Sequence, residues 1–157
     1  MITIQCDTRE HRSEWERISG QLDSLGVKYF RSKLYVGDYQ SLDNPRMVVD
    51  RKKDLQELCG NVCQQHERFR AELVRAQEAG IQIVILCEHG GSIKALEDIY
   101  FWENPRRRES PKAMNGWQLF KVLNTMKSKY GVRFEFCDKR QTGRRIVEIL
   151  TDGNDGR

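Results

Sequence analysis

The chain has 157 residues, 38% hydrophobic and 32% charged, which is enough for one packed core and leaves no room for a second. No apolar run approaches the ~20 residues of a membrane helix, and no basic leader precedes a long apolar stretch, which excludes a spanning segment and a secretory signal. With five cysteines, an odd number, and a net charge of only +4, we expect a reduced, cytoplasmic protein whose partner is not revealed by charge alone.

The first half of the chain alternates between strand and helix patterns. Residues 2–6 alternate around β-branched types and predict a short strand. A helix is expected from Ser13, which would form a capping box with Glu16, to a stop at Gly26. Three strands without an intervening helix, typical of an antiparallel meander, then follow at 27–30, 34–39 and 47–50.

The second half continues the alternation. A nearly continuous apolar run at 81–86 predicts a strand buried on both faces, as in parallel sheets. The other expected elements are a short helical turn at 54–59, helices at 64–79, 92–99, 116–130 and 143–150, a mobile loop at 102–116 and a strand at 132–136. The pattern predicts an α/β fold with a mixed central sheet flanked by helices. We expect one domain over 1–151 and a disordered tail over 152–157.

The segment 36–54 carries the most informative charged residues. Asp38 lies near the end of one predicted strand, and Asp50 and Lys52 lie two apart on the next. Because residues i and i+2 of a strand point to the same face, Asp50 and Lys52 should project together, and a hairpin would bring Asp38 beside them. Two carboxylates beside one ammonium are costly to desolvate unless a cation neutralises them.

A divalent metal ion would provide that neutralisation. Mg²⁺ (or Mn²⁺) binds one or two carboxylates, keeps several waters and takes a substrate phosphate. The ion would polarise the phosphoryl group and lower the pKa of a bound water that attacks phosphorus. Lys52 would orient that water or help to deprotonate it, and would offset charge in the transition state. An Asp-x-Lys after an Asp on the preceding strand is also how PD-(D/E)xK nucleases assemble their sites.

Three short motifs extend this pattern and occur in a fixed order: Asp7-Thr8-Arg9-Glu10, Gly37-Asp38-Tyr39 and Asp50-Arg51-Lys52. They resemble the XPF family of structure-specific endonucleases, which joins Asp-x-Arg-Glu, Gly-Asp, and Glu-Arg-Lys followed, after three intervening residues, by Asp. The resemblance covers residues 2–90 well and the remainder loosely. It implies a restriction-endonuclease-like PD-(D/E)xK fold and a metal-dependent DNA endonuclease acting on branched, flapped or junction DNA, with a part in repair or recombination.

The resemblance also implies roles for individual residues. Asp38 and Asp50 would be metal ligands, with the backbone carbonyl of Arg51 completing the inner shell. Lys52 would orient or help to deprotonate the attacking water. The remaining motif residues would lie beside the site, the acids Asp7 and Glu10 as further ligands or outer-shell groups, and Arg9 and Arg51 to orient carboxylates or touch phosphate.

The chain departs from the family pattern in three ways. Asp50 occupies the position of the family's Glu and is one methylene shorter. The trailing acid falls on Gln56, with Asp54 and Glu57 nearby. The tandem helix-hairpin-helix module that often follows the nuclease domain is absent from these residues. We therefore expect a stand-alone bacterial or phage-like member that holds DNA by itself or with a partner.

Basic residues outside the motifs are candidates for DNA contacts. Arg68 lies where the family often places an arginine, and Arg106, Arg107 and Arg108 stand together between aromatic residues. Such residues supply non-specific affinity by binding phosphates. Family members dimerise through the C-terminal part of the domain, so the resemblance implies a homodimer or heterodimer.

Several alternatives stay open at the level of sequence. The acids and Lys52 could form a solvated ion pair, and Asp7 and Glu10 could be helix N-terminal acids. The chain could be a catalytically inactive DNA-binding or scaffold subunit of a nuclease complex that retains the fold. It could also be an exonuclease of the same superfamily, which would need a DNA end.

Overall fold

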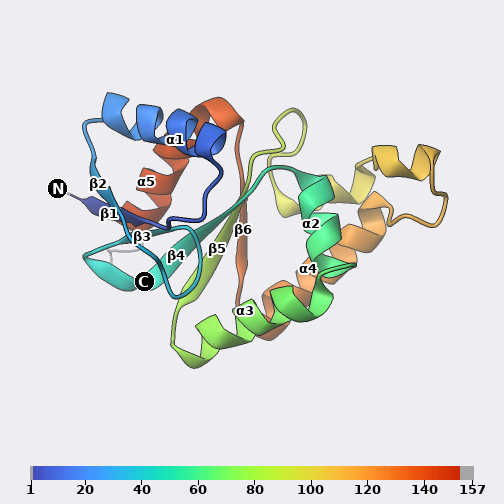
Figure 1. Ribbon diagram of the computed structural model, residues 1–157. Helices are drawn as coiled ribbons and strands as arrows, with labels where there is room; N and C mark the ends of the chain where they lie inside the picture. The colour runs from blue at the N-terminus through green and yellow to red at the C-terminus, as the bar shows by residue number, and fades with distance from the viewer. Residues whose placement is uncertain (1, 153–157) are drawn as a thin grey trace.

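The computed structural model describes residues 2–152 as a six-stranded mixed sheet between two layers of helices (Figure 1). The strands, in the spatial order β2-β1-β3-β4-β5-β6, are β1 (Thr3–Cys6), β2 (Lys28–Arg31), β3 (Tyr39–Ser41), β4 (Asn44–Lys52), β5 (Gln82–Cys87) and β6 (Arg133–Phe136). The α-helices are α1 (Arg12–Ser24), α2 (Leu55–Val62), α3 (His66–Glu78), α4 (Gly116–Tyr130) and α5 (Thr142–Asp152). The predicted α/β class with a mixed central sheet is confirmed.

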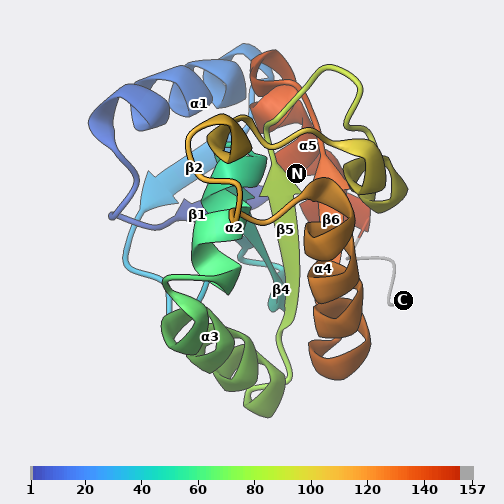
Figure 2. The ribbon, with the colours of Figure 1, turned by 90° about the vertical axis from the view of Figure 1, so that its right-hand side faces the viewer.

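The helices divide between the two faces of the sheet. Helices α1 and α5 cover one face, and α2, α3 and α4 cover the other, in front of β4 and β5 in Figure 2. The central strands send alternate side chains to the two cores: Val48 and Ile85 pack with α2–α4, whereas Val49 and Val84 pack with α1 and α5. Burial on both faces explains the continuous apolar run of β5. No helix within residues 2–152 is long and apolar enough to cross a membrane.

The order of the strands corrects the predicted meander. Strand β1 lies between β2 and β3: it pairs with β2 in parallel and with β3 antiparallel. Helix α1 joins β1 to β2 as a parallel crossover, which leaves the other edge of β1 for β3. Only the β3–β4 hairpin of the expected meander forms, and the parallel pairs β4–β5 and β5–β6 complete the sheet.

Several predicted boundaries also differ from the structure. Helix α1 begins at Arg12, after His11, and has no side-chain cap, so the capping box predicted at Ser13 is wrong. The expected strand at 34–39 is mostly loop, because only Tyr39 joins the sheet. The expected helix at 92–99 is a 3₁₀ helix, Leu96–Phe101.

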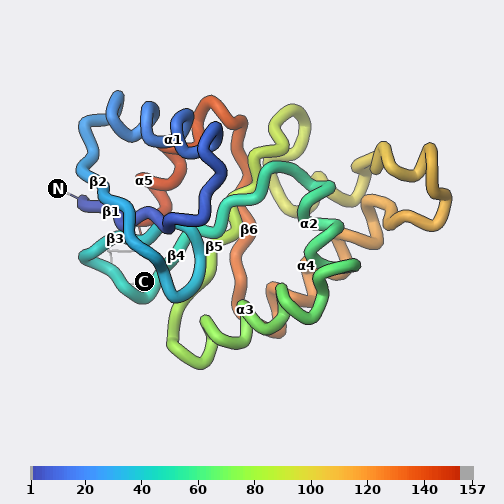
Figure 3. The backbone as a smooth tube through the Cα atoms, viewed as in Figure 1, coloured from blue at the N-terminus to red at the C-terminus, as the bar shows by residue number. Residues whose placement is uncertain are grey.

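The segment expected as a mobile loop at 102–116 has structure of its own. It contains a second 3₁₀ turn, Pro105–Arg108, whose first residues are capped by Asn104. Figure 3 shows this part of the tube, yellow to orange, extending away from the sheet beside α2 and α4. The tail predicted for 152–157 lies outside the described residues except for Asp152, which ends α5.

Candidate active site

A glycine turn and a hairpin place Asp38 against β4. Gly37 has a φ of +75°, and a Cβ at this position would lie 2.9 Å from the side chain of Val48, so the backbone approach requires glycine. The Asp38 N–H donates to the Val49 carbonyl at 2.8 Å, and Asp38 Oδ2 accepts the Arg51 N–H at 2.8 Å. The carboxylate is thereby held against the last residues of β4.

Asp50 and Lys52 project from β4 toward helix α3, on the same face as Val48. Lys52 Nζ lies 3.7 Å from Asp50 Oδ2 and 5.4 Å from the ring centroid of Phe69 on α3. The side chains of Lys52 and Asp50 keep 12% and 9% of their surface exposed, so the pair is largely buried without being sealed. The structure thus brings together the three side chains that the i, i+2 spacing and the hairpin predict.

A third carboxylate, Glu72 of α3, was missed by the sequence reasoning. Glu72 hydrogen-bonds with Asp50, and its pKa is raised to about 7, first by burial and then by the neighbouring charge of Asp50. Its sequence signal is its place three residues after Phe69, next to the apolar stripe that packs on the sheet, where an acid is unusual.

The carboxylates perturb one another. Burial raises the pKa of Asp38 well above its ordinary value, and the charges of Asp50 and Glu10 raise it further. Burial acts to lower the pKa of Lys52, but the surrounding acids, with Asp50 first among them, raise it overall. Lys52 therefore carries its positive charge at neutral pH.

The chemistry of this cluster fits a divalent cation. Three carboxylates, those of Asp38, Asp50 and Glu72, face a single ammonium, and Glu72 Oε1 is buried without a hydrogen-bond partner. Among the described residues no group of three or more His, Cys, Asp or Glu side chains is arranged to enclose an ion by itself. Mg²⁺ needs only one or two carboxylates and keeps most of its waters, so Asp38 and Asp50 are the residues that would hold it.

Asp7 and Arg9 form a separate pair at the end of β1. Asp7 is buried; its Oδ1 accepts the Leu34 N–H at 2.7 Å, and its Oδ2 accepts Arg9 N–H and Nε at 3.1 and 2.7 Å. These bonds occupy the carboxylate, so Asp7 positions a loop and an arginine. Arg9 remains 59% exposed and lies within the electrostatic reach of Asp38 and Glu72.

Arg51 points to the opposite face of the sheet, into a buried ion-pair network. Its guanidinium donates to both oxygens of Glu10 at 2.9 and 3.1 Å and to Glu88 at 2.5 Å, and only 8% of its side chain is exposed. Arg17 binds Glu88 at 2.8 Å and Glu14 at 2.7 Å. The Arg51 guanidinium is thus engaged by carboxylates and turned away from the surface.

The same network engages Glu10 and Glu88 with hydroxyl groups. Tyr39 donates its hydroxyl to Glu10 at 2.9 Å, and Thr142 of α5 donates to Glu88. Glu10 therefore lies across the sheet from Lys52 and acts on Asp38 only through its charge. Glu88 and Arg17, which complete the network, carried no motif in the sequence.

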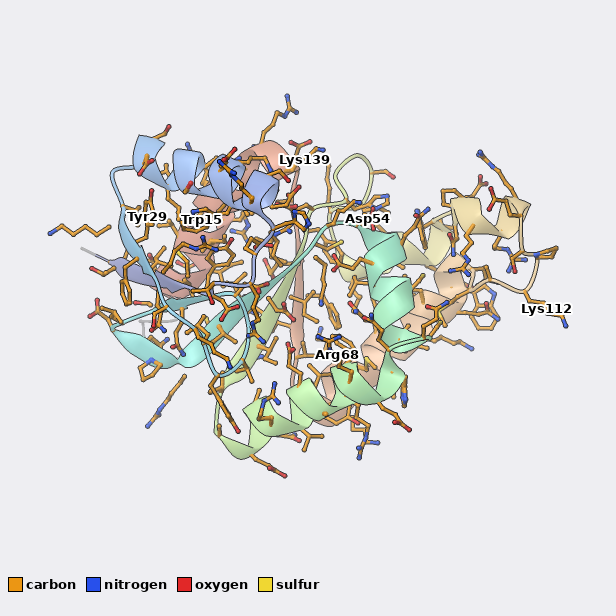
Figure 4. All side chains as sticks on the ribbon, in the orientation of Figure 1. Trp15, Tyr29, Asp54, Arg68, Lys112 and Lys139 are labelled. Atoms are coloured by element: carbon orange, nitrogen blue, oxygen red, sulfur yellow. The ribbon has the colours of Figure 1, made fainter. Side chains whose placement is uncertain are left out.

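The basic residues predicted for DNA contacts occupy different surroundings. A cleft of about 870 Å³ opens between the start of α1, helix α2 and residues 104–114, and Arg106 lines it together with Lys53 and Lys112. Arg107 donates instead to the Ala113 carbonyl at 2.7 Å. Arg108 is exposed and lines a neighbouring pocket. Figure 4 shows Lys112 at the tip of the projecting segment, Asp54 at the start of α2, and Arg68, also exposed, on α3.

Comparisons with known proteins agree with this architecture. The model of the ERCC4 domain family matches residues 6–149. The chain is similar to the solved structure of XPF from Aeropyrum pernix, with a TM-score of 0.68 and 22% identity, covering 99% of this chain and 64% of that one. A second structure, XPF from the same organism in complex with DNA, matches with a TM-score of 0.70 and 20% identity, covering 100% and 67%. No curated protein matches the chain.

Proposed function

Because the chain belongs to the ERCC4 domain family, we propose that it is a divalent-metal-dependent endonuclease that cuts branched, flapped or junction DNA. The observation that carries the proposal is the convergence of Asp38, Asp50 and Lys52 on one face of β4, with acid in excess of cation. The solved relative in complex with DNA supports the choice of substrate. At 20% identity the similarity to that relative supports a shared fold only. The chemistry must therefore be inferred from the residues of this chain.

Asp38 and Asp50 would hold the ion, with the Arg51 main-chain carbonyl as a proposed further ligand. Mg²⁺ or Mn²⁺ bound there supplies a Lewis acid and lowers the pKa of a coordinated water. Lys52, charged at neutral pH, donates hydrogen bonds to the attacking water or to a phosphoryl oxygen and offsets the developing negative charge. Its positive charge makes it a donor rather than the acceptor of the water's proton.

DNA would lie across the exposed cations near this site. Arg9, which pairs with Asp7 but is 59% exposed, is the first candidate for a phosphate contact, and Arg106 of the 870 Å³ cleft is the next, followed by Arg68 and Arg108. A single phosphate contact supplies affinity with no dependence on sequence. We expect Arg106→Ala to weaken binding uniformly and to lower the slope of log K against log salt by about 1. Arg140→Ala, an exposed position on the 3₁₀ turn Lys139–Gln141, should leave both unchanged.

The proposed partner besides DNA is a second subunit, identical or different. Exposed aromatic side chains gather where the 3₁₀ turn Leu96–Phe101 packs on α4: Phe101 is 83% exposed, and Tyr100 and Trp117 are 46% and 41% exposed. An apolar surface of this kind is typical of an interface. Light scattering of the wild type and of Phe101→Asp tests it, since the variant should shift a dimer toward monomer.

Cleavage assays test the central proposal. Supercoiled plasmid and branched oligonucleotides are incubated with Mg²⁺, Mn²⁺ or chelator, using the wild type, Asp50→Asn and Lys52→Ala, with the exposed Glu78→Gln as a matched control. We expect metal-dependent cutting by the wild type and the control, and a loss of at least about 100-fold in the two site variants with DNA binding retained. A clean wild type that cuts nothing with either metal contradicts the proposal. Failure to open closed circles, with degradation from ends, identifies an exonuclease.

One observation favours a second candidate, an inactive DNA-binding or scaffold subunit. Gln56 replaces the trailing acid of the family pattern, and the structure leaves it exposed on α2, where it lines the large cleft. A scaffold predicts salt-sensitive DNA binding without cleavage and without binding of a divalent ion near Asp38. The cleavage assay and a metal titration separate the two candidates.

A further inference from the structure

We propose that Glu72 is the third acid of the metal centre and that it binds the water shell of the ion. The inference rests on the proposed function, since it assigns a residue to the same site. It concerns a position on α3 outside the three sequence motifs.

The first observation is an unpaired buried oxygen. Within residues 2–152 only two buried side-chain oxygens lack a hydrogen-bond partner, Asn61 Oδ1 and Glu72 Oε1. A buried carboxylate oxygen without a donor costs free energy unless a ligand satisfies it. The other contact of Glu72 is with Asp50, which we assign to the ion, so the unpaired oxygen belongs to the same cluster.

The second observation is that the other acids nearby are already engaged. Asp54 caps helix α2 by accepting the Glu57 N–H at 2.9 Å, and Glu57 in turn accepts the Lys53 N–H at 2.6 Å. Asp7 is occupied by Arg9 and by the Leu34 N–H. Glu72, in contrast, lies beside Asp50 and has a buried oxygen that accepts no hydrogen bond.

The third observation concerns the reach of Glu72. Among the described residues no three ligand side chains are placed to enclose an ion, so Glu72 does not complete an inner shell with Asp38 and Asp50. A hydrated Mg²⁺ presents its waters to acceptors around it, and a carboxylate that binds one of them orients it. Glu72, which contacts Asp50 and lies within the electrostatic reach of the Lys52 ammonium, would fill this outer-shell role.

Metal binding provides a test that does not depend on cleavage. The full chain is titrated with Mn²⁺, followed by electron paramagnetic resonance, for the wild type, Glu72→Gln, Glu72→Asp and the matched control Glu78→Gln. Loss of the outer-shell negative charge should weaken Mn²⁺ binding and cleavage by about 10- to 100-fold in Glu72→Gln, with partial recovery in Glu72→Asp and no change in the control. Circular dichroism and DNA binding in chelator should stay at the wild-type level.

The outcomes separate this inference from the proposed function. A wild type that cuts DNA, with Glu72→Gln equal to it in Mn²⁺ affinity and rate, overturns the role of Glu72 alone. A wild type that binds Mn²⁺ but cuts nothing, with weaker binding in Glu72→Gln, supports Glu72 and contradicts the nuclease. A wild type that neither binds Mn²⁺ nor cuts overturns both. If Glu72→Gln unfolds, normal folding with weakened binding in Glu72→Asp still supports the role, and unchanged binding in that variant overturns it.

Discussion

The two faces of the sheet at the end of β4 handle charge in opposite ways. On the α1 and α5 face, Arg51 and Arg17 bind Glu10, Glu14 and Glu88 through nitrogen–oxygen distances of 2.5–3.1 Å. On the α3 face the acids meet one ammonium, with the closest cation–carboxylate approach at 3.7 Å. Both clusters are largely buried. On β4 they are formed by consecutive residues, because Arg51 lies between Asp50 and Lys52.

The difference indicates which cluster is structural and which is a site. Guanidinium groups satisfy the carboxylates of the first cluster in fixed geometry, so that cluster holds β4, β5, α1 and α5 together. The second cluster retains excess negative charge, raised pKa values and an unpaired oxygen, which is the arrangement that a bound cation would neutralise. Acids without a cationic partner are costly to bury, and a bound ligand of opposite charge would remove that cost.

The largest effect on stability is expected on the α1 and α5 face, where guanidinium groups pair with the acids. Arg51→Met leaves Glu10 and Glu88 buried without their cation, which should lower the free energy of unfolding by about 3–5 kcal/mol. Urea unfolding measures this change. Adding Glu10→Gln and Glu88→Gln to the same variant should recover a large part of the loss, because the uncompensated charges are then gone. A loss below about 1 kcal/mol for Arg51→Met would mean that the network is not structural.

On the α3 face, removing a charged acid should not lower the free energy of unfolding. In metal-free protein, Asp50→Asn removes the charge that repels Asp38 and Glu72, keeps an amide that can hydrogen-bond with both acids, and gives up the 3.7 Å contact with Lys52. The free energy of unfolding should be unchanged or higher by about 1 kcal/mol, although cleavage is lost. The same urea experiment, with chelator present, measures it. Destabilisation as large as that of Arg51→Met would make the acid cluster structural and remove the contrast between the faces.

The pH dependence of stability should also distinguish the faces. Burial and the charge of Asp50 raise the pKa of Glu72 from 4.5 to about 7, so the folded state binds this proton more tightly than the unfolded chain. The resulting stability is fully present below pH 4.5 and is lost as pH rises through about 7. Asp38 contributes in the same direction, whereas the Lys52 and Arg75 charges oppose the shift of Glu72.

Urea unfolding of the metal-free protein at several pH values between 5 and 8 checks this dependence. Glu72→Gln should flatten the decline, and saturating Mg²⁺ should oppose it, since the ion favours the ionised acids. A wild-type stability that rises over this range would contradict the assignment of raised pKa values to the cluster.

The smallest effect on stability is expected at the exposed edge of the ion-pair network on the α1 and α5 face. Glu14 is 32% exposed, and its bond to Arg17 is an i,i+3 pair on α1. Glu14→Gln should therefore cost no more than about 1 kcal/mol in the free energy of unfolding. Thermal or urea unfolding measures it, with the exposed Glu16→Gln on the same helix as control. A cost near that of Arg51→Met would extend the structural network to the surface.

Much of the site follows from local sequence patterns. The i, i+2 spacing of Asp50 and Lys52 and the expected hairpin were sufficient to predict that these two side chains and Asp38 meet on one strand face. The apolar run of β5 likewise predicted a central parallel strand. Strand periodicity and glycine stereochemistry are properties of a few consecutive residues, so they can be identified before the fold is known.

Other features depend on residues far apart in the chain. The place of β1 between β2 and β3 results from competition for its two edges, and no local pattern reports that outcome. Glu72 joins Asp50 only because α3 packs on that face, and Glu88 joins Arg51 only at the end of the neighbouring strand. The motif acid Asp7 is instead engaged by Leu34 of a distant loop.

The amino-acid order therefore determined the class of the fold, the motifs and the face of β4 on which Asp38, Asp50 and Lys52 meet. The tertiary structure decided which acids are neutralised and which are left in excess. The physical reason is that the direction in which a side chain leaves a strand is a local property, whereas its charge partners are brought to it by the packing of other elements.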